Sequence, residues 1–123
     1  RVLAALEDLR VALNGGLQLG LHELECHYAC YAPGTHYARH LDRSPAGSER
    51  VVSAILYLNP EWRPGDGGEL AIYTGDREVL VAPRGGTLVT FLSERFEHEV
   101  RTARVARRSL TGWYRRRALG LGL

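Results

Sequence analysis

The sequence contains no lysine and no methionine, and it has only two cysteines among its 123 residues. It also has no run of 18 apolar residues, which excludes a membrane-spanning helix of ordinary length. All sixteen basic residues are arginine, and against fourteen acidic residues they leave a net charge of +2. This charge is too small to indicate a nucleic-acid or acidic-membrane partner. We therefore expect neither a nucleic-acid partner nor a membrane partner.

The two cysteines, Cys26 and Cys30, lie in a segment with strand-type residues. In a strand, four residues span roughly 13 Å, which is beyond the reach of a disulfide. We therefore expect two free thiols, as is typical of a reducing cytoplasm. The sequence opens at Arg1, without methionine and inside a helical pattern, so we expect the native N-terminus to be missing. The exclusive use of arginine in an Ala-, Leu- and Gly-rich chain suggests a GC-rich bacterial genome.

The length predicts a single domain over residues 1–123. Apolar residues at helical spacing predict a helix over residues 2–14, ended by Gly15 and Gly16. The β core follows over about 22–115, and residues 116–123 are predicted to be a solvated tail. Closely spaced β-type runs favour a sandwich or barrel over alternating strands and helices. A Ser-Pro-Ala-Gly-Ser loop is expected at 44–48, and strands are expected at 24–32, 37–42, 51–58, 69–74, 78–82, 87–93, 96–101 and 105–115.

His40 and Asp42 form an H-x-D triplet in the second predicted strand. Residues i and i+2 of a strand point to the same face, so the imidazole and the carboxylate lie side by side. Such pairs are common on protein surfaces, and this one gains meaning only with a third ligand. His98, in the predicted strand 96–101, is the candidate for that ligand. Two histidines and one carboxylate form the facial triad that binds Fe(II) in non-haem oxygenases and leaves coordination positions open.

Arg107 is predicted to share a cavity with His98. A turn between Thr102 and Ala103 would pair residues 98–101 with 104–107, so that residue 98 faces residue 107. Directly opposed side chains lie on one face, with Cβ atoms ~5 Å apart. An arginine is the expected partner of a buried carboxylate, because it is permanently charged and bidentate. Arg108 is the competing candidate, but alternation turns its side chain to the opposite face.

Several motifs occur in one order along residues 22–115. They are His40-x-Asp42, Tyr57-Leu58-Asn59, Gly67-Gly68-Glu69-Leu70, Pro83-Arg84-Gly85-Gly86-Thr87-Leu88-Val89-x-Phe91, His98-Glu99-Val100, Arg107 and Trp113-Tyr114. In this combination the sequence resembles the Fe(II)/2-oxoglutarate dioxygenases of the prolyl 4-hydroxylase type. It is most similar to the hypoxia-sensing prolyl hydroxylases and their bacterial relatives. The resemblance implies a mainly β fold, with a double-stranded β-helix (jelly-roll) core, an N-terminal supporting helix and an iron site at the mouth of the core.

The resemblance also implies the roles of the principal site residues. His40, Asp42 and His98 would bind the iron, and Arg107 would bind the distal carboxylate of 2-oxoglutarate. These four are the expected catalytic residues. The expected cofactors are Fe(II), 2-oxoglutarate as cosubstrate and dioxygen, with ascorbate as an additional candidate.

Four further residues match pocket positions of the family. Tyr57 matches a tyrosine that reaches the distal carboxylate, and Tyr31 falls near one that contacts the cosubstrate close to the metal. Thr111 and Trp113 match residues that line the pocket, and Trp113 and Tyr37 are candidate substrate contacts. Without the resemblance, the aromatic members of this set would equally be packed strand residues.

The implied reaction hydroxylates an unactivated C–H bond while 2-oxoglutarate is converted to succinate and CO2. Asp42 favours hydroxylation, because related halogenases lack this carboxylate. The expected substrate is a prolyl residue in a protein or peptide, hydroxylated at C4, and a free amino acid or small metabolite is the alternative. A metal-binding jelly-roll module without turnover is disfavoured because it would not need Arg107. The other three histidines, His22, His27 and His36, have no place in the pattern, and we expect surface or structural roles for them.

Overall fold

The computed structural model describes residues 1–44 and 48–117, which form one helix and eight strands. In chain order the elements are α1 (Val2–Leu17), β1 (Glu23–Tyr31), β2 (Tyr37–His40), β3 (Ser48–Tyr57), β4 (Leu70–Thr74), β5 (Arg77–Val81), β6 (Leu88–Leu92), β7 (His98–Val100) and β8 (Arg107–Arg117). The eight predicted strands are confirmed, with ends that shift by a few residues. The predicted tail beyond 117 and the middle of the predicted loop at 44–48 lie outside the described residues.

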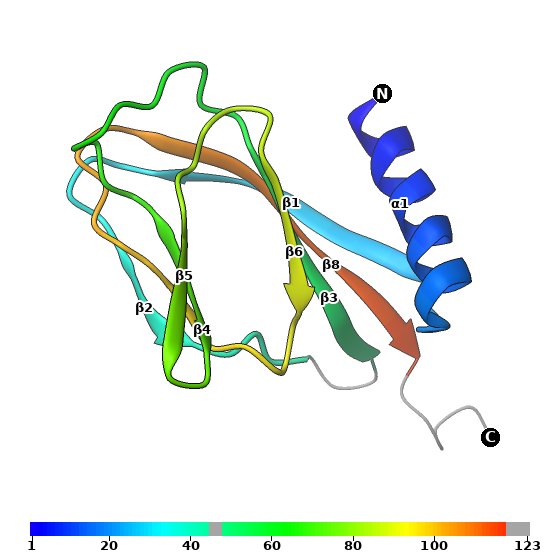
Figure 1. Cartoon of the computed structure of the whole chain (residues 1–123). Helices are drawn as coiled ribbons and strands as arrows, with labels where there is room; N and C mark the ends of the chain where they lie inside the picture. Colours follow the sequence, from blue (N-terminus) through cyan, green and yellow to red (C-terminus); the bar gives the residue numbers. More distant parts are fainter. Residues whose placement is uncertain (45–47, 118–123) are drawn as a thin grey trace.

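The strands form two four-stranded antiparallel sheets that face each other (Figure 1). Sheet I has the order β1-β8-β3-β6, and sheet II has the order β2-β7-β4-β5. The chain repeatedly crosses from one sheet to the other, as the predicted jelly roll requires. The inner faces of the two sheets therefore bring together residues that are far apart in the sequence.

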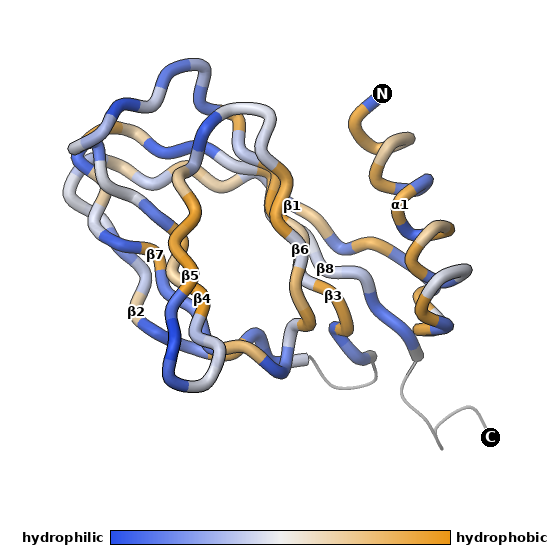
Figure 2. The backbone as a smooth tube through the Cα atoms, viewed as in Figure 1, coloured by the Kyte–Doolittle hydropathy of each residue, from blue (hydrophilic) through white to orange (hydrophobic). Residues whose placement is uncertain are grey.

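Apolar side chains between the sheets form the core. Ile55 and Tyr57 of sheet I pack with Leu70, Ile72 and Val100 of sheet II, and all five are buried. Figure 2 shows the apolar stretches of β4 and β5, which meet at a hydrophilic turn. Burial of the five core side chains holds the two sheets together, because each removes apolar surface from water.

Helix α1 packs beside β1 and β8 on the outer side of sheet I (Figure 1). The hydroxyl of the buried Tyr114 donates a 2.7 Å hydrogen bond to the carbonyl of Leu6 in the helix. The predicted end of the helix at residue 14 is wrong, since α1 continues through both glycines to Leu17. It ends where Gln18 adopts φ 52°, and the Asn14 side chain fixes the following turn by bonding both backbone groups of Leu21. The described residues contain no helix with the length and apolar character needed to span a bilayer.

The last strand is longer than the sequence predicts. Residues 116 and 117 belong to β8 and pair with β3, and Arg116 binds Glu49 at 2.7 Å. The prediction that the tail begins at residue 116 is therefore wrong. The prediction of two free thiols is confirmed for Cys26 and Cys30.

The predicted pairing of residues 98–101 with 104–107 is also wrong. Strand β7 pairs with β2 and β4 in sheet II, whereas β8 pairs with β1 and β3 in sheet I. The segment between them crosses from one sheet to the other and is fixed at the buried Ala103, whose backbone bonds Thr35 and Gly34. The position of Arg107 relative to His98 is therefore set by the spacing between the two sheets and not by a local turn.

Gly67 makes a close approach to this crossing segment. A Cβ atom at Gly67 would lie 2.2 Å from the carbonyl oxygen of Thr102, whereas a Cβ at Gly75 would meet nothing within 4 Å. Both residues have nearly the same positive φ, 73° and 75°. We expect Gly67→Ala to lower the free energy of unfolding by about 1–3 kcal/mol more than Gly75→Ala, because only Gly67→Ala adds a steric clash to the backbone strain. Chemical denaturation of both variants measures the difference, and equal losses would contradict it.

Candidate active site

A cavity of about 550 Å³ lies between the two sheets. Strands from both sheets contribute to its wall, and most of the site residues predicted from the sequence face it. Those that line it are Tyr31, Tyr37, His40, Asp42, His98, Arg107, Thr111 and Trp113. Tyr57 lies behind Arg107, to which its hydroxyl is hydrogen-bonded.

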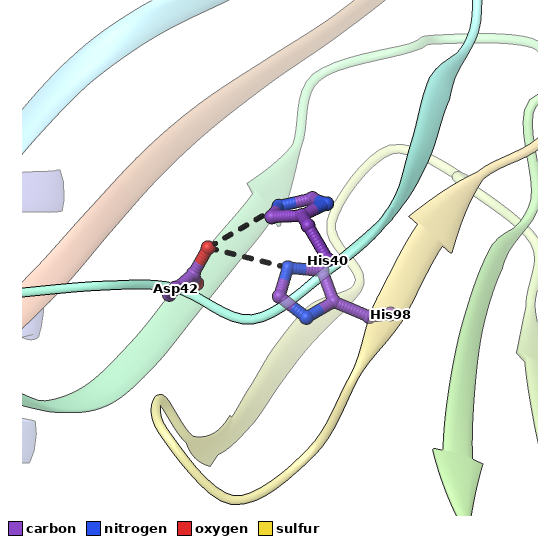
Figure 3. A group of neighbouring side chains, drawn as sticks. All are labelled: His40, Asp42 and His98. Carbon is purple, nitrogen blue, oxygen red and sulfur yellow. Dashed lines mark ion pairs between the residues drawn. The ribbon is translucent and has the colours of Figure 1, made fainter.

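His40, Asp42 and His98 converge at one point of this cavity (Figure 3). His40 ends β2 and His98 begins β7, and the two residues are directly paired across these strands. Asp42 follows two residues after His40 and turns its carboxylate toward both rings. Its Oδ1 atom lies 3.4 Å from Nε2 of His40 and 3.4 Å from Nε2 of His98.

Backbone carbonyls fix the orientation of both imidazole rings. Nδ1 of His40 lies 2.7 Å from the carbonyl oxygen of Ala38, and Nδ1 of His98 lies 3.1 Å from that of Phe96. A carbonyl oxygen accepts but cannot donate, so Nδ1 carries the proton in each ring. When such a ring is neutral, its Nε2 atom has a free lone pair on the side of Asp42, as is typical of metal-binding histidines.

The Asp42 carboxylate is held by side chains of the opposite sheet. Its Oδ2 atom accepts hydrogen bonds from the Ser53 hydroxyl at 2.6 Å and from the Trp113 indole N–H at 2.9 Å. Burial by itself raises the pKa of Asp42, but His98, Ser53 and Trp113 outweigh burial and hold this pKa below its ordinary value. Burial likewise lowers the pKa of His98, but Asp42 and the Phe96 carbonyl raise it above the ordinary imidazole value. Asp42 is thus an ionised carboxylate at neutral pH.

The donor set fits a divalent metal ion. Two ligand atoms about 2.1 Å from an ion and at right angles lie about 3 Å apart, close to the distances between Oδ1 and the two Nε2 atoms. Two imidazole nitrogens and one carboxylate oxygen are the donors of the Fe(II) facial triad, and they leave other positions open. The residues present therefore fit Fe(II), although Co, Ni or Zn would bind the same donors.

Arg107 occupies another part of the same cavity and is 2% exposed. Its Nε donates to the carbonyl of Gly68 at 2.8 Å, and one terminal nitrogen bonds the Tyr57 hydroxyl at 3.2 Å. The guanidinium also lies 5.2 Å from the centre of the Tyr31 ring. Among residues 1–44 and 48–117, no carboxylate lies within ion-pair distance of Arg107. A buried charge without a partner is costly, so this guanidinium is suited to binding an anion from outside the chain.

Two tyrosines lie beside this guanidinium, Tyr31 in the cavity wall and Tyr57 behind Arg107. Burial raises the pKa of Tyr57 and of Tyr31, and Arg107 opposes the rise in both. Both hydroxyls therefore stay protonated at neutral pH and are able to donate hydrogen bonds. Thr111 follows on the same face of β8 as Arg107, with its hydroxyl 3.2 Å from that of Ser109.

Aromatic and basic side chains line the rest of the cavity wall. The Tyr37 ring lies 4.1 Å from the His40 ring, and the guanidinium of Arg50 lies 3.8 Å from the centre of the Trp113 ring. Sequence analysis missed Arg50 as a lining residue. It also assigned His27 to the surface or a structural role, whereas His27 is exposed and yet lines the cavity, 5.5 Å from Trp113. His27 and Tyr31 are four residues apart on β1, so their side chains lie on the same face of the strand. This alternation could have predicted that His27 lines the cavity.

Ser53 is a further residue that sequence analysis missed. It shares its face of β3 with Ile55 and Tyr57, so alternation places its side chain toward the interior. Alternation does not indicate that the Ser53 side chain meets Asp42, because Asp42 follows a strand of the other sheet.

Comparisons with known proteins agree with this geometry. The family model described as the 2OG-Fe(II) oxygenase superfamily matches residues 26–115. Egl nine homolog 1 from Homo sapiens is 34% identical over 122 residues, covering 92% of this chain and 28% of the relative.

Two solved structures are also similar. A prolyl-4-hydroxylase from Pseudomonas putida has a TM-score of 0.89 and 53% identity, covering 94% of this chain and 65% of the other. A prolyl hydroxylase from Trichoplax adhaerens, in complex with a hypoxia inducible factor oxygen degradation domain peptide fragment, has a TM-score of 0.82 and 33% identity. The matched region covers 92% of this chain and 54% of the Trichoplax adhaerens chain. This chain thus spans about a quarter of the human relative and less than two thirds of each solved structure. With three quarters of its residues inside the family match and a His-Asp-His group that could hold a metal ion, the chain belongs to the 2OG-Fe(II) oxygenase superfamily.

Proposed function

We propose that this protein is an Fe(II)- and 2-oxoglutarate-dependent hydroxylase that acts on a prolyl residue of a protein or peptide. The observation that carries the proposal is the buried Arg107, which has no acidic partner among the described residues and lines the same cavity as the triad. A protein that only bound a metal would have no use for such a group. A cosubstrate with a carboxylate at one end and metal-binding oxygens at the other uses both.

His40, Asp42 and His98 would hold the iron through two Nε2 atoms and Oδ1. When bound, Fe(II), 2-oxoglutarate and dioxygen supply the oxidising chemistry, in which 2-oxoglutarate becomes succinate and CO2 and the substrate gains a hydroxyl group. The chain does not itself carry out this oxidation. Its residues bind the reactants, orient them and keep solvent away from them.

Arg107 would bind the distal carboxylate of 2-oxoglutarate. Its Nε is already held by Gly68 and one terminal nitrogen by Tyr57, so the guanidinium is oriented before the anion arrives. The Tyr57 hydroxyl would donate a second hydrogen bond to the same carboxylate. Preorganised donors in a site shielded from water bind a carboxylate more tightly than exposed ones do, because little reorganisation is needed.

The substrate assignment rests on the relatives and on the cavity wall. The similar solved structures are prolyl hydroxylases, and one of them is in complex with a peptide. In this chain Tyr37 and Trp113 present ring surfaces to the cavity near the metal ligands. Flat rings of this kind suit the pyrrolidine ring of a prolyl residue. A free amino acid or small metabolite as substrate is the less favoured alternative.

Peptide-dependent turnover tests the substrate assignment. We expect proline-containing peptides to stimulate succinate release from 2-oxoglutarate in the presence of Fe(II) and oxygen, and to gain the mass of one oxygen atom at proline. His40→Ala should abolish both signals. Stimulation by a free amino acid and by none of the peptides would contradict the assignment and favour the alternative.

Substitution of Arg107 tests the cosubstrate site. We expect Arg107→Lys to raise the KM for 2-oxoglutarate by at least about tenfold, because a lysine cannot reproduce the contacts to Gly68, Tyr57 and the carboxylate together. Arg108→Lys is the matched control, since Arg108 is exposed and lies on the opposite face of β8. Steady-state kinetics at varied 2-oxoglutarate measures the effect. An unchanged KM in Arg107→Lys would place the cosubstrate elsewhere.

Proton competition tests the metal ligands. Metal binding needs neutral imidazoles, and the pKa of His98 is raised, so its protonation begins above the ordinary value of about 6.5. We expect the affinity for Mn(II), a redox-inert substitute for Fe(II), to fall as pH decreases from about 7 to about 5.5. His36→Asn should leave the profile unchanged because His36 is exposed and outside the cavity. Calorimetry across this range measures the affinity, and a flat profile would argue against the histidine ligands.

A further inference from the structure

The two oxygens of the Asp42 carboxylate have different surroundings. Oδ1 faces Nε2 of His40 and Nε2 of His98, each at 3.4 Å. Oδ2 accepts two short hydrogen bonds, from the Ser53 hydroxyl at 2.6 Å and the Trp113 indole at 2.9 Å. The carboxylate is thus oriented with one oxygen available to a metal and the other engaged by the protein.

Both donors come from the sheet opposite Asp42. Ser53 on β3 and Trp113 on β8 are directly paired in sheet I, so their side chains lie on the same inner face. Asp42 follows β2 of sheet II. The hydrogen bonds therefore span the space between the sheets and fix the carboxylate relative to both of them.

A second serine orients the Ser53 hydroxyl. Ser93 follows β6, is fully buried, and has its Oγ 2.9 Å from Oγ of Ser53. The Ser53 hydroxyl thus lies within hydrogen-bond distance of both Oδ2 of Asp42 and Oγ of Ser93. The three side chains form one buried hydrogen-bonded network, which restricts the position of the Ser53 hydroxyl.

We propose that Ser53 is a positioning residue that holds Asp42 with Oδ1 toward the metal site. A carboxylate that is not held by hydrogen bonds can turn and bind a metal through one oxygen or through both. When Ser53 is removed, only the Trp113 donor remains on Oδ2, so the carboxylate is freer to leave the orientation in which Oδ1 faces both Nε2 atoms, and metal binding weakens. The inference rests on the proposed function, because it concerns the metal site of that reaction.

Mn(II) binding to the metal-free protein tests the inference without any turnover. We expect Ser53→Ala to weaken Mn(II) binding by about 10- to 100-fold, the usual effect of removing a group that orients a metal ligand. Ser53→Thr keeps the hydroxyl and should restore most of the affinity. Ser109→Ala is the matched control, since Ser109 is equally buried and lines the same cavity but does not contact Asp42. Electron paramagnetic resonance of free Mn(II) measures each dissociation constant, and thermal unfolding verifies that each variant is folded.

Each outcome bears on one of the two proposals. Wild-type affinity in Ser53→Ala, or an equal loss in Ser109→Ala, would overturn the role of Ser53 while leaving the hydroxylase proposal intact. Loss of Mn(II) affinity in Ser53→Ala with no succinate formation by the wild type would support the positioning role and contradict the function. A wild type that does not bind Mn(II) would overturn both. If Ser53→Ala does not fold, Ser53→Cys keeps most of the volume with a weak donor, and the same loss is expected.

Discussion

Two charged side chains between the sheets, Asp42 and Arg107, constrain the rest of the structure. Each makes hydrogen bonds to residues on the opposite side of the space between the sheets. Asp42, after β2 of sheet II, is held by Ser53 and Trp113 of sheet I. Arg107, on β8 of sheet I, is held by the carbonyl of Gly68, shortly before β4 of sheet II. Because an unsatisfied buried charge costs several kcal/mol, these contacts require a fixed spacing between the sheets.

The same contacts divide the cavity into two chemical regions. At one, an ionised carboxylate and two imidazoles offer three donor atoms that could hold a metal ion. At the other lies the guanidinium of Arg107, beside Tyr31 and Tyr57. Apolar side chains of Ile55, Leu70 and Val100 line the cavity as well, which lowers the local dielectric and strengthens both sites. The proposed cosubstrate, which carries a carboxylate and metal-binding oxygens, would use both regions of the cavity.

The differences between the predicted and observed elements have physical causes. Gly15 and Gly16 do not end α1, because packing on sheet I and the Asn14 contacts to Leu21 outweigh the low helix propensity of glycine. Strands β7 and β8 do not form the expected hairpin, because the edges of β7 are already paired with β2 and β4. The prediction that Arg107 shares a cavity with His98 nevertheless agrees with the structure, for a different reason. The two side chains approach from opposite sheets and are not neighbours on one face.

The sequence by itself determined the number and approximate limits of the strands, and that Arg107 and Arg108 face opposite sides of theirs. These follow from turn residues and from an alternation of period two, both of which are local. Only the tertiary structure decided which strands share a sheet and which residues face each other across the cavity. The contacts of Asp42 with Ser53 and Trp113, 11 and 71 residues away, are of this kind. Alternation specifies the face of a strand, but the partner on the other side depends on how the whole chain packs.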